Sequence, residues 1–371
     1  MKIFKGLFLG SLLSGFFLSS TLAQSSQDKT KLKLGIIGLV HDHVHWIFNR
    51  DNHDLEVVGI VETNPAAIKK FKERYQLDDA LFFSSYEDLM REAKPETVSA
   101  FNETAEHLDV ASFFLPKNIP VMVEKPLATS YADAQEMVRL SEKHQTPLLV
   151  NYETSWYEST YETKALIEDG ALGKPKKLVF NTGHMGPVEI GCSPEFLAWL
   201  TDPVLNGGGA VTDFGCYGAN ISTWLLEGRT PERVTAVLKQ TKPSIYPKVD
   251  DDTTIILDYD DLQVVIQASW NWTHHRKDME VYLDKASIYA LDATRMRILE
   301  YDSGKEQTHE PQSIEAYQKD PFRLLVEMVK QGRKIDSHSL YGTSNNLTVV
   351  KLLELAKRSA DLERTVEWTE L

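Results

Sequence analysis

The sequence predicts an α/β protein with two domains: an N-terminal Rossmann domain built on a doubly wound parallel sheet, then a C-terminal α+β domain with an open antiparallel sheet. Between residues 31 and 151, short apolar runs without polar alternation are separated by amphipathic helical stretches, as is typical of parallel strands buried on both faces. Between residues 152 and 371, strands follow one another with turn signals such as Asp302-Ser303-Gly304, which favours antiparallel pairing.

The first domain is expected to alternate strands and helices. Its strands are predicted at residues 32–39, 55–61, 80–83, 97–101, 119–124 and 147–150, and its helices at 64–77, 86–93, 104–115 and 130–144. In such a sheet, ligands bind in the crevice at the carboxyl ends of the strands, so the loops after the strands are the candidate site.

The second domain is expected to begin with a helix at 155–169 that ends at Gly170, followed by a strand at 178–183. A helix is then predicted from the loop 206–210 to Leu226, and further strands at 233–240, 253–259, 262–272, 278–283, 287–291 and 296–301. These would form an antiparallel sheet of five or six strands, which is a candidate face for a homo-oligomer. Two last helices, at 318–331 and 344–359, can pack back on the first domain.

Composition excludes several function classes. The 371 residues contain 40 Lys+Arg and 54 Asp+Glu, a formal charge of −14, which argues against nucleic acid or an anionic membrane as a partner. The two cysteines, Cys192 and Cys216, exclude a disulfide-framework miniprotein and a four-cysteine zinc site. Whether they pair is left open. The run Asp250-Asp251-Asp252 is expected to be a solvated turn and not a metal site.

Residues 1–23 have the order of a secretory signal peptide. Lys2 and Lys5 precede an apolar run over 6–18, and small residues ending in Ala23 offer a cleavage site. The run is shorter than the roughly 20 residues of a spanning helix. We therefore expect an exported protein, periplasmic or secreted, without a membrane contact after cleavage.

The turn after the first strand, residues 38–43, resembles a dinucleotide-binding turn only in part. Gly38 can make the tight turn, but Val40 and His43 stand where the fingerprint has its second and third small residues. Glu62, at the end of the second strand, can accept hydrogen bonds from a ribose diol and repel a 2′-phosphate. This favours NAD over NADP.

Two sequence motifs strengthen the prediction of a dinucleotide cofactor. Glu124-Lys125-Pro126 follows the fifth strand, and the segment 207–217, GGGAVTDFGCY, opens a helix with Asp213 and Tyr217 four residues apart on one face. In this order and spacing they resemble the glucose–fructose oxidoreductase/inositol dehydrogenase (Gfo/Idh/MocA) family, over residues 32–371. The resemblance implies an NAD-dependent oxidoreductase that acts on a sugar or polyol hydroxyl.

The resemblance also implies roles for residues. Lys125 would contact both nicotinamide and substrate, Tyr217 would exchange a proton with the substrate hydroxyl, and Asp213 would orient the substrate. The other cofactor residues would be Gly38, His43, Glu62, Asn102, Thr104, His107 and Glu124. From elementary electrostatics, a tyrosine beside a lysine cation is expected to have a lowered pKa. A saccharide pocket is expected to include Tyr152, Trp156 and His184, with Trp270, Trp272 and His274 as further candidates.

If the protein is exported, a cofactor that exchanges with solution after each turnover is not expected, because no replenished NAD pool is expected outside the cytoplasm. We therefore expect tightly bound NAD that is recycled within one catalytic cycle. Three alternatives stay open: a redox-neutral, NAD-dependent glycoside hydrolase or lyase of the same fold, a non-catalytic sugar-binding protein, and a metal-dependent hydrolase. The last would use the segment His41-Asp42-His43-Val44-His45, in which His-x-His follows a strand. No metal ligands are predicted in the favoured hypothesis.

Overall fold

The computed structural model describes residues 31–371. The predicted signal peptide and its cleavage site after Ala23 lie outside the described residues. Within 31–371, no helix combines the length and the apolar character that crossing a membrane requires.

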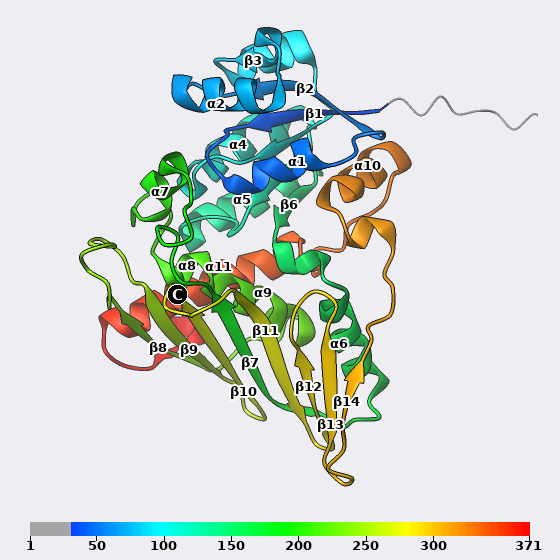
Figure 1. Ribbon diagram of the computed structural model, residues 1–371, viewed down its shortest axis with the longest axis vertical. Helices are drawn as coiled ribbons and strands as arrows, with labels where there is room; N and C mark the ends of the chain where they lie inside the picture. Colours follow the sequence, from blue (N-terminus) through cyan, green and yellow to red (C-terminus); the bar gives the residue numbers. More distant parts are fainter. Residues whose placement is uncertain (1–30) are drawn as a thin grey trace, which may run out of the picture. The chain divides into compact units, whose positions relative to one another are not determined.

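The first sheet is parallel throughout and has six strands in the order β3-β2-β1-β4-β5-β6 (Figure 1). Its central strands are apolar on both faces because helices cover both, and the residues of β4, β5 and β6 are all buried. This confirms the predicted fold class of the first domain. The strands are β1 (Leu32–Ile37), β2 (Leu55–Val61), β3 (Phe82–Phe83), β4 (Thr97–Ala100), β5 (Val121–Glu124) and β6 (Leu148–Asn151).

Capping residues set the ends of the main helices around this sheet. Asn64 caps the helix that begins with Pro65, and Ser130 caps the helix that ends at His144. The first helix is unusually short because residues 42–44 form a 3₁₀ turn before it. The helices are α1 (His45–Asn49), α2 (Pro65–Tyr75), α3 (Tyr86–Asp88), α4 (His107–Phe114) and α5 (Tyr131–His144).

The second sheet has nine strands in the order β14-β13-β12-β11-β7-β10-β9-β8-β15. The prediction of five or six strands, all antiparallel, is wrong in number and in one pairing, because β7 runs parallel to β10. The chain leaves β7 through helices and returns to the sheet at β8, so β7 is inserted between β10 and β11 without a hairpin to either. The strands are β7 (Pro175–Gly183), β8 (Arg233–Lys239), β9 (Asp252–Asp258), β10 (Gln263–Ser269), β11 (Arg276–Leu283), β12 (Ala286–Ala290), β13 (Met296–Glu300), β14 (Glu306–His309) and β15 (Val366–Glu367).

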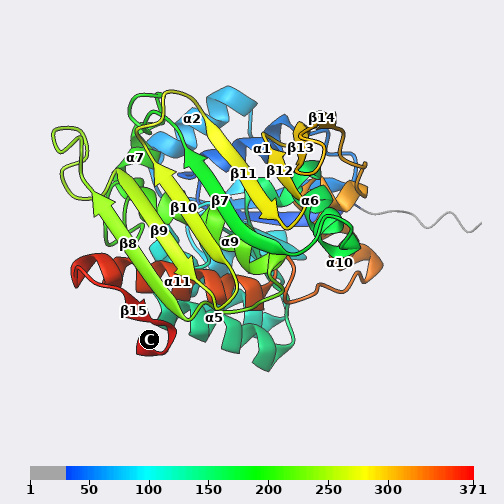
Figure 2. The ribbon, with the colours of Figure 1, turned by 90° about the horizontal axis from the view of Figure 1, so that it is seen from below.

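Helices cover one face of the second sheet, and Figure 2 looks onto the opposite face. Alternate residues of β8, β9 and β10 are buried against α9 (Gly215–Leu225) and α11 (Thr343–Asp361). The remaining helices of this part are α6 (Glu158–Asp169), α7 (Pro194–Leu200) and α8 (Ala210–Asp213). The predicted helix up to Leu226 is therefore interrupted, because Phe214 separates α8 from α9.

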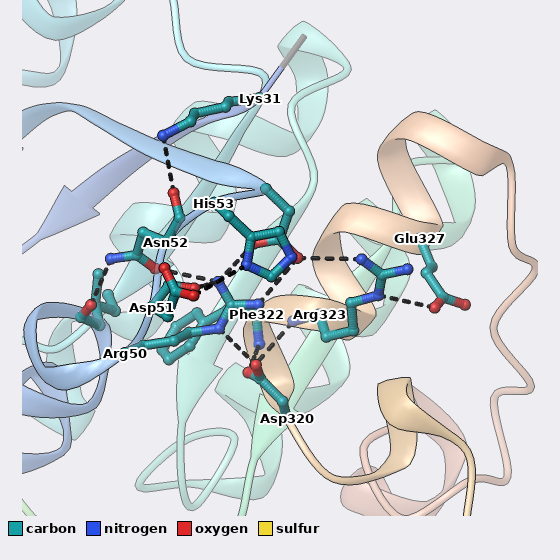
Figure 3. Close-up of polar contacts among 11 residues, drawn as sticks. Lys31, Arg50, Asp51, Asn52, His53, Asp320, Phe322, Arg323 and Glu327 are labelled. Atoms are coloured by element: carbon teal, nitrogen blue, oxygen red, sulfur yellow. Dashed lines mark hydrogen bonds and ion pairs between the residues drawn. The ribbon is translucent and has the colours of Figure 1, made fainter. Parts of the chain in front are cut away.

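The last two helices return to the first sheet. The helix α11 contacts α5 and β6, and α10 (Pro321–Gln331) contacts β1. Figure 3 shows the ion pairs that hold α10. Arg50 donates to Asp54 at 2.6 and 3.0 Å and to Asp320 at 2.5 Å, while Arg323 donates to Asp54 at 3.2 Å and to Glu327 at 3.0 Å. Asp320 also caps α10, so one carboxylate serves the helix end and the contact.

Candidate active site

Two cavities lie at the carboxyl ends of the first sheet, on either side of the turn after β1. We call the larger, of about 530 Å³, the central cavity. It is lined by segments that follow strands of the first sheet and by residues of the second part of the chain, among them His43, Lys125, Glu153, His184, Asp213, Tyr217 and Lys277. The second, of about 500 Å³, is the edge cavity; it lies over the ends of β1 to β4 and is lined by Gly38, Val40, Glu62, Asn102, Glu103 and Glu106, among others. This is the place that the strand topology predicts for a ligand.

Lys125 and Asp213 form a buried ion pair in the central cavity. The ammonium of Lys125 contacts the Asp213 carboxylate and donates to the Asp213 carbonyl at 3.1 Å, and both side chains are about 95% buried. Trp270 Nε1 donates to the second carboxylate oxygen at 3.0 Å. Burial opposes both charges, but the partner outweighs it, so the pKa of Lys125 is raised and the pKa of Asp213 is lowered. Both groups are therefore charged, and Asp213 primarily holds Lys125.

Tyr217 shares this cavity but is not acidified. Its ring lies 5.4 Å from the Lys125 ammonium and 5.0 Å from that of Lys277. The prediction of a lowered pKa is wrong: burial raises the pKa of Tyr217 well above its ordinary value, and the Glu153 carboxylate adds to this. The side chain remains a phenol. The helix break at Phe214 also means that Asp213 and Tyr217 do not share one continuous helix.

His43 and Glu124 form a second polar pair at the same cavity. Nδ1 of His43 lies 2.9 Å from Glu124 Oε2, and Asn151 Nδ2 donates to Oε1 at 2.7 Å. Trp156 Nε1 in turn donates to Asn151 at 2.9 Å. Burial alone would raise the pKa of Glu124, but the two neighbouring histidines and these hydrogen bonds lower it to about 2, so the group is a carboxylate.

His41, His43 and Glu124 are also close enough to raise the question of a metal. Their ligand atoms lie within 4.8 Å of one another, a grouping that can hold an ion. However, His41 Nδ1 accepts the backbone N–H of His43 at 3.2 Å, so the neutral ring carries its proton on Nε2, the nitrogen that faces Glu124. Burial keeps the pKa of His41 well below its ordinary value, and the ring stays neutral. A protonated nitrogen is not a ligand, so the hydrogen bonding does not support a metal here.

The edge cavity fits the adenosine end of a dinucleotide. Gly38 has a φ of 77°, and a Cβ there would lie 2.8 Å from the Asn102 backbone, so the turn requires glycine. Glu62 accepts the backbone N–H of Leu39 at 2.9 Å and those of Thr63 and Asn64 at 2.8 Å, which fixes its carboxylate at the cavity wall. This is where a ribose diol would donate.

The turn itself offers little to a pyrophosphate. The N–H groups of Val40 and His41 both donate to the Phe101 carbonyl, at 3.1 and 2.9 Å. Between Gly38 and Val44, the N–H of Asp42 is the one without an acceptor among residues 31–371. The residues of the edge cavity therefore fit the adenosine end of a dinucleotide, whereas the turn offers few N–H groups to the pyrophosphate.

The remaining predicted cofactor residues divide into two groups. Asn102 lines the edge cavity, but its amide donates to Glu106 at 2.9 Å. Thr104 and His107 are buried and line neither cavity; His107 Nδ1 bonds to the Leu127 carbonyl at 3.2 Å, and burial lowers its pKa to about 4.

The edge cavity also has acidic lining residues that the sequence reasoning missed, Glu103 and Glu106. Burial and the charge of Glu106 raise the pKa of Glu103 to about 7.

Few of the predicted substrate residues reach the central cavity beside Asp213 and Tyr217. His184 lines it, with a pKa lowered by burial to about 4 and Nδ1 accepting the Gly186 N–H at 3.0 Å. Tyr152 is fully buried behind Tyr217. The cavity wall also excludes three tryptophans, each of which donates its indole N–H in a hydrogen bond: Trp156, Trp270 and Trp272. His275, and not the expected His274, lines the cavity.

Charged residues that sequence reasoning missed complete the central cavity. Lys277 pairs with Glu153, Arg276 with Asp278 at 2.8 Å, and Arg295 with Asp292 at 2.5 Å. Glu153 was detectable in principle because it follows β6 at its carboxyl end. Cys192 and Cys216 are free thiols, and burial raises the pKa of each to about 12.

The aspartate run 250–252 is not a solvated turn. The Asp250 carboxylate accepts the backbone N–H groups of Gly209 and Val211, at 2.8 and 2.7 Å, and so caps the helix that ends in Asp213. Asp251 is buried and accepts the N–H groups of Thr241 and Lys242. Their role is to position the loop that presents Asp213.

Comparison with known proteins agrees with this architecture. A family model described as "Oxidoreductase family, NAD-binding Rossmann fold" matches residues 32–152, and one described as "GFO/IDH/MocA C-terminal domain" matches residues 160–289. Among curated proteins, a trans-1,2-dihydrobenzene-1,2-diol dehydrogenase of Xenopus tropicalis is 28% identical over 218 residues, 58% of this chain and 61% of that protein. A D-xylose 1-dehydrogenase [NADP(+)] of Haloarcula marismortui is 28% identical over 157 residues, 42% of this chain and 40% of that protein. The alignments thus span about three fifths of the first relative and two fifths of the second.

Solved structures share the fold over more of the chain. An aldose-aldose oxidoreductase from Caulobacter crescentus, complexed with glycerol, has a TM-score of 0.75 at 23% identity and covers 91% of this chain and all of its own. An inositol dehydrogenase homolog from Azotobacter vinelandii, complexed with NAD⁺, has a TM-score of 0.77 at 18% identity and covers 91% of this chain and 97% of its own. At these identities the likeness establishes the fold alone.

Proposed function

Because the chain belongs to the Gfo/Idh/MocA oxidoreductase family, we propose that it transfers a hydride between a carbon of a carbohydrate or polyol and bound NAD. The observation that carries this proposal is the Lys125–Asp213 ion pair, in which the residue after β5 meets the last residue of α8 at a cavity beside the edge cavity. Glu62 would hold the ribose and Lys125 would face the reacting end.

Two side chains of the central cavity can stabilise the charge that develops in such a reaction. When bound, the nicotinamide supplies the hydride acceptor or donor. Lys125, kept charged by Asp213, stabilises the negative charge that develops on the substrate oxygen. Tyr217, kept as a phenol, donates a hydrogen bond to that oxygen.

The charges of the cavity favour an uncharged ligand. The Lys and Arg side chains that line the cavity are Lys125, Arg276, Lys277 and Arg295. Each is paired with a carboxylate, so within residues 31–371 the cavity has no unpaired Lys or Arg for an anionic substituent. The paired groups still offer donors and acceptors to hydroxyl groups. A neutral sugar or polyol, such as the glycerol bound to the Caulobacter crescentus enzyme, is the substrate class that we propose.

We further propose NAD over NADP and retention of the cofactor through catalysis. Glu62, Glu103 and Glu106 line the edge cavity and would repel a 2′-phosphate. Retention is supported by α7, whose Trp199 Nε1 lies 3.4 Å from the Val40 carbonyl and whose Phe196 packs on His41, so that this helix covers the turn. We propose export from the pattern of residues 1–23. An exported enzyme would need to retain its cofactor, because no replenished NAD pool is expected outside the cytoplasm.

The test is to denature the purified protein and assay the supernatant for NAD(H) and NADP(H). We expect about one equivalent of NAD(H) per chain. Protein without nucleotide that also fails to bind added NAD in calorimetry would overturn the proposal and favour the sugar-binding alternative. With nucleotide present, a panel of neutral sugars and of aryl glycosides distinguishes net oxidation from the redox-neutral glycosidase alternative.

A further inference from the structure

The central cavity contains an acid–base group that the proposed function has not used. Oxidation of an alcohol releases a proton along with the hydride, so the cavity needs a proton acceptor. Tyr217 is a phenol with a raised pKa, Lys125 is an ion-paired cation, and the pKa of Glu153 lies at about 2. None of these three is a suitable base at neutral pH.

The other histidines of the cavity are also poorly placed. His41 and His184 each accept a backbone N–H on Nδ1, so the neutral ring carries its proton on Nε2 and has no free lone pair. His275 is exposed and has no carboxylate partner among residues 31–371. His43 differs from all of them because its Nδ1 faces a carboxylate.

We propose that His43 and Glu124 form a catalytic dyad, in which Nε2 of His43 accepts the proton of the substrate hydroxyl. The Glu124 carboxylate, 2.9 Å away, takes the hydrogen bond of Nδ1–H and leaves the lone pair on Nε2. No residue of the described range 31–371 hydrogen-bonds to Nε2, and the side chain, 17% exposed, lies on the cavity wall.

Neighbouring side chains fix the dyad in place. Asn151 and Trp156 hold the far oxygen of Glu124 through two successive hydrogen bonds of 2.7 and 2.9 Å. Trp46 stacks on the His43 ring with centroids 3.9 Å apart and planes 18° apart. A base whose ring plane, tautomer and carboxylate partner are all fixed in advance has the arrangement that general-base catalysis requires.

The proton balance of the step is simple. The substrate O–H bond breaks and an Nε2–H bond forms on His43, while the hydride leaves the same substrate carbon for the bound cofactor. The imidazolium that results is stabilised by Glu124, and Lys125 stabilises the substrate oxygen until the carbonyl forms. His43 is then a catalytic residue, and Glu124 is a positioning residue that acts through it. This assignment rests on the proposed function.

The first test does not depend on turnover. Nitrogen NMR of the protein labelled with ¹⁵N-histidine reports the tautomer of each ring, and the loss of one signal set in His43→Asn assigns His43. We expect the Nδ1–H tautomer in the wild type and its loss in Glu124→Gln. An Nε2–H tautomer in the wild type overturns the dyad, as does a shift of the His43 and His41 signals by stoichiometric Zn²⁺, which would indicate a metal site instead.

The second test measures turnover of the sugar identified by the substrate panel. His43→Asn and Glu124→Gln should each lower kcat by about 10²–10⁴-fold, with imidazole restoring part of the rate in His43→Asn. His45→Asn is the matched control, since His45 belongs to the same histidine string but bonds to Tyr75 at 2.7 Å, away from the cavity. Asn151→Ala serves if Glu124→Gln does not fold, with a smaller loss expected.

The outcomes separate the two proposals. Full activity in His43→Asn together with loss in Tyr217→Phe overturns the dyad and leaves the oxidoreductase proposal standing. Absence of nucleotide and of turnover in the wild type overturns the proposed function, while the tautomer measurement still decides whether the dyad exists.

Discussion

The Lys125–Asp213 pair has a consequence for stability that can be measured apart from activity. Lys125→Met leaves the Asp213 carboxylate buried without its cation, and removal of one partner of such a pair costs about 3–5 kcal/mol. The double variant with Asp213→Leu should recover most of this loss but no turnover. Urea unfolding of the wild type, the single variant and the double variant measures the loss of stability and its recovery. A double variant less stable than Lys125→Met would contradict this account.

A second prediction at the residue scale concerns acid stability. His107 is fully buried and its pKa is lowered to about 4, whereas in the unfolded chain it is near 6.5. Below pH 6.5 the unfolded state therefore binds a proton that the folded state does not. The free energy of unfolding should be constant above this pH and fall by about 3 kcal/mol for this group between pH 6.5 and 4.

Replacement of His107 isolates this contribution. His107→Gln keeps a donor for the Leu127 carbonyl and removes the titration. We expect a shallower loss of unfolding free energy between pH 7 and pH 4.5 than in the wild type, measured by urea titration at each pH. His53→Gln, an exposed histidine, is the control and should leave the slope unchanged.

The sequence predicts which residues come together better than it predicts their contacts. Lys125, Asp213, Tyr217 and His184 were all expected at a ligand site, and they do lie around one cavity. Tyr152 is expected at this site too, but it is fully buried and does not line the cavity, because residue type does not say which aromatic ring is core. The pKa of Tyr217 could not be foreseen either, since it depends on burial and on Glu153, which comes from another element.

At the scale of elements, ion pairs of Arg50 and Arg323 hold α10 against the segment before β2, and we call these pairs the clamp. Arg50→Met leaves Asp54, a side chain 9% exposed, with only the weaker Arg323 contact. We expect a loss of about 2 kcal/mol in the free energy of unfolding. Arg91→Met, in an exposed pair with Asp88, should leave the free energy of unfolding essentially unchanged. Equal effects in thermal denaturation would show that the clamp contributes little.

The elements that sequence patterns missed have identifiable causes. The strand Glu306–His309 is polar and mostly exposed, and Val366–Glu367 has only two residues, so neither has an apolar pattern to detect. The parallel pairing of β7 depends on the strands that flank it, and these come later in the chain, after α9. A local sequence pattern does not contain this information. The strands of the first sheet were predicted well because burial on both faces makes them continuously apolar.

At the scale of the whole molecule, we propose that the uncovered face of the second sheet joins two copies of the chain. A row of side chains crosses four strands on this face: Thr235, Ile256, Val265 and Val179 lie opposite one another in register. Three of the four, Ile256, Val265 and Val179, are apolar, and an apolar row on an open sheet is typical of an oligomer face.

The double variant Ile256→Lys/Val265→Lys tests this proposal by placing two like charges in the middle of the row. We expect a dimer or larger oligomer in the wild type and a monomer in the variant, measured by light scattering after size exclusion. Val204→Lys changes an exposed residue elsewhere and should leave the mass unchanged. A monomeric wild type would contradict the proposal.

The matched ion pairs around the central cavity also bear on how a ligand arrives. The chain carries a net charge of −14, and the lining cations Lys125, Arg276, Lys277 and Arg295 are each paired with a carboxylate. Within residues 31–371 the cavity therefore has no unpaired Lys or Arg to attract an anion. Sugar phosphates would meet long-range repulsion, whereas free sugars would meet none. Capture of a neutral sugar should then proceed at a rate that does not change with ionic strength, and the molecule would discriminate against phosphorylated metabolites before any contact is made.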